Sequence, residues 1–171
     1  MMPEDTTVVL GIPIPSTSSF FLTVVGLHAL VGLVCVVAGA IAMLSPKRTG
    51  RHPLFGAIYY WGMVVVVASA AGLSIVRWAD DYHLFILGLL AFLAASVGRT
   101  ARRRRWPDWA RLHIGSMGLS YILLLTAFYV DNGKSLPLWR ELPPIVYWLL
   151  PAAIGLPLIV HALLKHPLAR R

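Results

Sequence analysis

Acidic residues and cysteine are scarce in this sequence. Only 7 of its 171 residues are Asp or Glu, and 13% are charged, whereas an average soluble domain has about 25%. The single cysteine, Cys35, cannot form a disulfide within the chain and excludes cysteine-based zinc and iron–sulfur sites. No nucleotide-binding loop, Ser-His-Asp set or His-Glu zinc motif is present. Because no carboxylate lies inside an apolar run, a proton-coupled transporter or ion pump is also disfavoured.

What the chain has in excess is apolar sequence, because 58% of its residues are hydrophobic. Apolar runs predict five membrane-spanning helices, at about 19–44, 54–76, 82–98, 109–130 and 144–164. The third run is the shortest, at roughly 25 Å for a rise of about 1.5 Å per residue. We therefore expect an all-α integral membrane protein, a five-transmembrane-helix bundle forming a single domain at 19–164. Short tails at 1–18 and 165–171 complete the chain.

The distribution of Lys and Arg predicts the orientation of this bundle. Twelve of the 15 basic residues lie after the first, third and fifth runs, and three lie on the opposite side. The positive-inside rule places the richer side in the cytoplasm. The N-terminal tail should then be external and the C-terminal tail cytoplasmic, in the cytoplasmic (inner) membrane of a bacterium.

The net charge of +8 raises the question of an acidic partner. Nucleic acid is a poor candidate, because the basic residues sit in short segments between apolar runs, where charge sets topology. The bilayer accounts for them better, with anionic lipid headgroups at the arginine-rich segment 99–111. A membrane protein partner or a second copy of the chain remains an open alternative.

Histidine is the main functional clue, because polar groups within a bilayer need partners and face the bundle interior. His28 shares one face of the first helix with Gly32, Cys35 and Gly39, at spacings of about one, two and three turns. One interpretation is close helix packing, with His28 hydrogen-bonded across the interface. The other is a cofactor or substrate that lies against the glycines and touches His28.

His113 and His161 lie at similar depths, each about one turn inside the cytoplasmic rim, on the fourth and fifth helices. Two neutral imidazoles at one depth are what the iron of haem b needs as axial ligands. His52, at the cytoplasmic mouth of the second helix, could cap that helix, contact lipid or share a ligand with His113. Simple interfacial roles for all three histidines stay open.

Three sequence blocks carry a resemblance to a known family. The segment 52–60 has the pattern His-x-x-x-Gly-x-x-Tyr, through His52, Gly56 and Tyr59. Together with the blocks 28–39 and 113–133, it resembles a family of small bacterial multi-pass membrane proteins of unknown function. The resemblance implies a compact bundle in which His28, His52 and His113 are the positions of interest.

Two functions follow as hypotheses. One is a membrane redox protein that binds haem b, or contacts a quinone, through the candidate residues His113, His161, His52 and His28, with His113 and His161 as the iron ligands. The other is a non-enzymatic permeation module, accessory subunit or scaffold, in which the histidines only form hydrogen bonds between helices.

The predicted orientation can be tested with reporter fusions. A reporter placed after Arg171 should behave as cytoplasmic, and one placed in the segment 131–143 should behave as external. The reverse result at both sites would contradict the charge argument.

Overall fold

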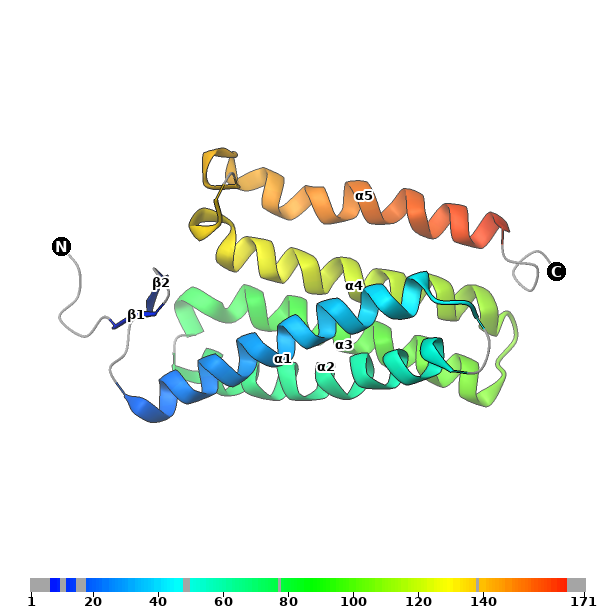
Figure 1. Ribbon diagram of the computed structural model, residues 1–171, viewed down its shortest axis with the longest axis horizontal. Coiled ribbons are helices and arrows are strands. Elements are labelled where there is room, and N and C mark those ends of the chain that lie inside the picture. Colours follow the sequence, from blue (N-terminus) through cyan, green and yellow to red (C-terminus); the bar gives the residue numbers. More distant parts are fainter. Residues whose placement is uncertain are drawn as a thin grey trace.

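The computed structural model describes residues 7–9, 12–14, 18–47, 50–76, 78–137 and 139–165. Five long helices form a bundle (Figure 1). All five are long and apolar enough to cross a membrane, which confirms the five expected helices and supports a multi-pass membrane protein. These helices are α1 Ser19–Leu44, α2 Arg51–Val76, α3 Trp78–Arg104, α4 Trp109–Asn132 and α5 Pro144–Lys165.

Two helices extend beyond their apolar runs. α2 begins at Arg51 rather than near residue 54, and α3 covers 27 residues rather than 82–98 alone. The reason is that hydropathy marks only the length of a helix that lies within the apolar layer. The backbone hydrogen bonding of the helix continues beyond that layer. α3 also carries Asp80 and Asp81 in its first turn and three arginines in its last, the arrangement that the helix dipole favours.

The helices pack mainly against their neighbours in sequence, from α1 on α2 through to α4 on α5. α1 also reaches α4, which closes α1–α4 into a group, while α5 lies along the outer side of α4 (Figure 1). The connections from α1 to α2 and from α3 to α4 lie at the same end of the bundle. This end carries Lys47, Arg51 and Arg102–Arg105, and we call it the basic end.

Short elements occupy the opposite end. Strands β1 Thr7–Val9 and β2 Ile12–Ile14 pair antiparallel, with Val8 opposite Pro13, in the segment expected to be a simple tail. Two 3-10 turns, η1 Gly133–Ser135 and η2 Trp139–Glu141, connect α4 to α5.

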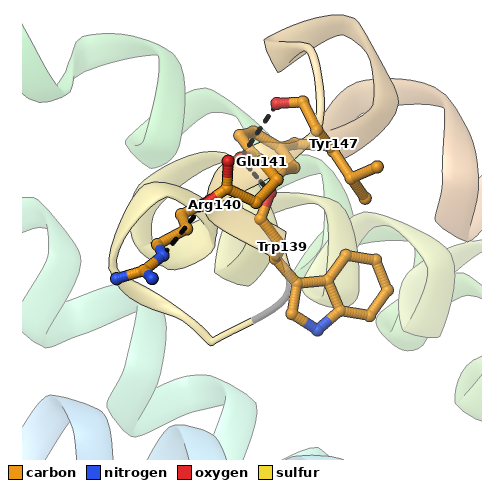
Figure 2. Close-up of polar contacts among 5 residues, drawn as sticks. Trp139, Arg140, Glu141 and Tyr147 are labelled. Atoms are coloured by element: carbon orange, nitrogen blue, oxygen red, sulfur yellow. Dashed lines mark hydrogen bonds and ion pairs between the residues drawn. The ribbon is translucent and has the colours of Figure 1, made fainter.

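Tyr147 fixes that connection to α5. Its hydroxyl donates to the carbonyl of Trp139 at 2.7 Å and approaches the carbonyl of Leu142 at 3.3 Å (Figure 2). A side chain at Gly133 would collide with the Tyr147 ring, since a Cβ there would lie 2.8 Å from a ring carbon. The α4–α5 turn is therefore built around one buried tyrosine.

Small residues allow the four inner helices to approach closely, as is common where helices associate in lipid. Cys35 of α1 sits directly over Gly62 of α2, where a Cβ would lie 2.5 Å from its sulfur. Gly39 lies against the rings of Tyr59 and Tyr121, and a Cβ at this glycine would lie 2.6 Å from a ring carbon of Tyr121. The small face of α1 is therefore a packing face at Cys35 and Gly39.

Two hydrogen bonds in this core join different helices, although the buried Ser96 hydroxyl has no hydrogen-bond partner among the described residues. The Tyr59 hydroxyl of α2 and the Ser120 hydroxyl of α4 lie 2.7 Å apart, and both residues are buried. The Tyr121 hydroxyl donates to the Val36 carbonyl of α1 at 3.0 Å. These bonds join α4 to the α1–α2 pair.

The two glycines of the α1 face should respond differently to the same substitution. Gly39→Ala forces the Tyr121 ring to move and should lower the free energy of unfolding by about 1–3 kcal/mol, the usual cost of overpacking. Gly32 has no neighbour within 4 Å of an added Cβ, so Gly32→Ala should be neutral or slightly stabilising. Thermal unfolding in one detergent measures both variants, and equal destabilisation would contradict this packing.

Candidate functional site

His52 and the end of α1 meet at the basic end because Pro46 interrupts the hydrogen bonding of α1. The carbonyl of Ala42 would normally accept from the residue four positions later, but that residue is Pro46, which has no N–H. Two side chains replace the missing donor. The Nδ1 of His52 lies 2.8 Å from the Ala42 oxygen, and the ammonium of Lys47 lies 3.1 Å from it. His52 therefore caps the C-terminus of α1 and not, as one sequence interpretation held, the start of its own helix.

His113 makes an equivalent contact between α4 and α3. Its Nδ1 lies 3.0 Å from the carbonyl oxygen of Gly98. Gly98 suits this position because it is buried, and a side chain there would press on Met117 and Ser116, at 3.1 and 3.2 Å from its Cβ. A glycine thus lets α4 come close enough for His113 to reach the backbone of α3.

These contacts bring the two imidazoles together. The ring centres of His52 and His113 lie 6.1 Å apart, with the ring planes at 83° to each other. Both rings are only partly accessible. The structure therefore creates a histidine pair from helices α2 and α4, although 60 positions separate the two residues in the sequence.

The hydrogen bonds also determine which ring nitrogen carries the hydrogen when each imidazole is neutral. A backbone carbonyl only accepts, so the Nδ1 of His52 and the Nδ1 of His113 must carry the N–H that donates. In a neutral imidazole the other nitrogen, Nε2, then keeps its lone pair. A carbonyl bonded to one nitrogen while the other stays basic is the usual support of a metal-ligating histidine.

Positive charge surrounds this pair. Lys47 and Arg102 both lie close enough to the two imidazoles to act on them electrostatically. Lys47 also donates to the Met43 carbonyl, and partial loss of hydration lowers its pKa from the ordinary value. Arg102 is exposed. The site therefore combines two lone pairs with two cationic groups.

His161 does not face this site. α5 packs on α4 through Ile159, whose side chain lies where a Cβ at Gly118 would be, at 2.5 Å. His161 is two residues further along, about 200° around the helix, and so it points away from α4. It is exposed, and the expected pairing of His113 with His161 is replaced by the pairing with His52.

His28 forms the hydrogen bond across the helix interface that the first interpretation of the α1 face expected. Its Nδ1 lies 2.8 Å from the Ser69 hydroxyl of α2, and that hydroxyl lies 2.8 Å from the Val65 carbonyl. The serine can donate its one hydrogen to the Val65 carbonyl and at the same time accept a hydrogen bond from His28. Nothing lies within 4 Å of a Cβ at Gly32, so the glycine one turn away leaves open space beside His28.

One feature of the site could have been found in the sequence. Pro46, four residues after Ala42, predicts a carbonyl without its helical donor, and Lys47 and His52 are among the polar residues that follow it. The contact of His113 with Gly98 has no such signal, because it depends on how α3 and α4 are aligned.

The described residues contain no group of three or more His, Cys, Asp or Glu side chains placed to hold a metal ion. A two-histidine arrangement is the one that the geometry supports. Comparison with known proteins adds no assignment, since no family model, curated protein or solved structure matches this chain.

Proposed function

We propose that this chain is a membrane redox protein that binds haem b between His52 and His113. The observation that carries the proposal is the pair of imidazoles 6.1 Å apart, each with its Nδ1–H bonded to a backbone carbonyl. Both Nε2 lone pairs are thereby kept for a ligand. The bound haem would supply one-electron chemistry, while the protein would fix the tautomers of the two histidines.

The separation of the ring centres has the size that two imidazoles on one iron need, provided that both Nε2 atoms point toward it. Two iron–nitrogen bonds of about 2 Å, the metal–imidazole distance known at zinc, and roughly 1 Å from each nitrogen to its ring centre require about 6 Å. The observed value is 6.1 Å. The cations at Lys47 and Arg102 would bind the two propionate groups by charge-assisted hydrogen bonds.

Iron fits this site better than a quinone. A quinone oxygen accepts hydrogen bonds, but each neutral ring has one N–H and donates it to the backbone. His52 and His113 can therefore offer only acceptors. Metal coordination uses the lone pairs that remain.

Applied to the basic end, the positive-inside rule favours a cytoplasmic position for the site, in a bacterial inner membrane. Electrons would then enter or leave at the cytoplasmic face. Oligomerisation or a membrane partner on the exposed faces of α1 and α5 is compatible with this arrangement.

A non-enzymatic role is the second candidate, and one observation favours it. Each of His28, His52 and His113 already makes a hydrogen bond between helices or to a helix end. In a scaffold or accessory subunit these bonds would be the whole purpose of the histidines.

Haem binding can be measured directly. The full chain, purified in mild detergent and supplied with haemin, should show a Soret band and the reduced spectrum of bis-imidazole iron. His113→Ala and His52→Ala should each abolish that spectrum, because either change removes one axial ligand. His161→Ala is the matched control and should leave the spectrum intact.

The non-enzymatic candidate predicts a different result. Wild-type protein would then bind haemin no better than the two variants do. Loss of the spectrum in His161→Ala would contradict the assignment of His52 as the second ligand.

A further inference from the structure

Arg99 is an arginine of α3 that lies against aromatic rings. It directly follows the apolar run 82–98 and so sits where α3 leaves the apolar layer at the basic end. Its guanidinium carbon lies 4.4 Å from the centre of the Tyr60 ring and 5.8 Å from the centre of the Trp61 ring. Stacking of this kind holds the planar guanidinium in one orientation, with its N–H groups along the edges.

The rings beneath Arg99 form a continuous aromatic face, made of Tyr60, Trp61 and Phe92. The Tyr60 ring centre lies 5.5 Å from that of Trp61 and 5.9 Å from that of Phe92, so the face joins α2 to α3. Trp61 is 61% exposed although it lies in an apolar helix. Exposed apolar side chains continue the surface on both helices, at Ile58, Val65, Leu93 and Val97.

Within the part of the chain that the structure describes, no acidic side chain forms an ion pair with Arg99. Among the described residues, the ion pairs formed by arginine involve Arg111 with Asp108 and Arg140 with Glu141. A cation at the edge of a bilayer lies within reach of anionic lipid headgroups, which attract it. The stacked position favours an anion that comes from the side of the membrane.

We propose that Arg99, Tyr60 and Trp61 form a binding site for the phosphate of an anionic phospholipid. The guanidinium edge donates to the phosphate, as Arg does in bidentate recognition, and an acyl chain runs along the aromatic face. The site is separate from the histidine pair and does not depend on haem. It assigns the lipid contact to one arginine, whereas the sequence alone pointed to the whole segment 99–111.

Native mass spectrometry of the full chain with dioleoyl-phosphatidylglycerol tests the site. Wild-type protein should retain one tightly bound lipid, and Arg99→Gln should weaken that binding by about tenfold, the loss of one charge-assisted bond. Arg104→Gln is the control, because it removes the same charge from an exposed position on the same helix. It should leave the tight binding unchanged.

The remaining arms separate the alternatives. Arg99→Lys should bind less tightly than wild type, because an ammonium keeps the charge but loses the stacked fork. Millimolar inorganic phosphate should not displace the lipid, and dioleoyl-phosphatidylcholine should bind more weakly. Displacement by phosphate, or equal losses in Arg99→Gln and Arg104→Gln, would overturn the proposal.

A second variant controls for misfolding of Arg99→Gln. Trp61→Ala removes a largely exposed ring and leaves Arg99 in place. It should weaken phosphatidylglycerol binding several-fold by removing stacking and acyl contact. Wild-type affinity in Trp61→Ala would contradict the role of the aromatic face.

Discussion

Polar groups within an apolar layer must find their partners inside the protein, and this constraint organises the whole bundle. It acts on the backbone where a helix ends and on the side chains between helices. At Ala42 the loss of one N–H, caused by Pro46, is repaired by Lys47 and His52. Deeper in the bundle, Tyr59 with Ser120 and Tyr121 with the Val36 carbonyl satisfy hydroxyl groups that would otherwise be costly.

The same constraint prepares the histidine pair for chemistry. Each imidazole uses one nitrogen to satisfy a carbonyl and is left with one basic nitrogen. The structural role of His52 and His113 and their proposed role as ligands are therefore compatible, because they use different atoms. Glycine at position 98 and small residues along α1 allow the close approach that places these atoms.

Much of the fold could be predicted from the sequence, because hydropathy and length alone identify helices that cross a bilayer. The ends of α2 and α3 could not, since the helices continue through 51–53 and 99–104, where charged and polar residues interrupt the apolar signal. The pairing of N-terminal residues as two short strands was also absent from the prediction. The orientation in the membrane remains a prediction from charge.

The candidate site was predicted in part. His113 was a candidate because of its depth and His52 because of its place at the mouth of the second helix, but depth favoured His161 as the partner of His113. The rotation of α5 decides otherwise, because Ile159 occupies the face toward α4 and turns His161 outward. Similarly, the sequence predicted that His28 forms a hydrogen bond to another helix. It could not identify Ser69 as the partner, because that depends on how α1 and α2 align.

The proposal requires that His52 and His113 carry hydrogen on Nδ1 and keep a lone pair on Nε2. Nitrogen NMR of the protein labelled with 15N-histidine measures this directly, because protonated and unprotonated ring nitrogens resonate far apart. Spectra of wild type, His52→Ala and His113→Ala assign the signals. Near neutral pH and without haemin, both residues should show a protonated Nδ1 and an unprotonated Nε2. A protonated Nε2 on both rings would contradict the account.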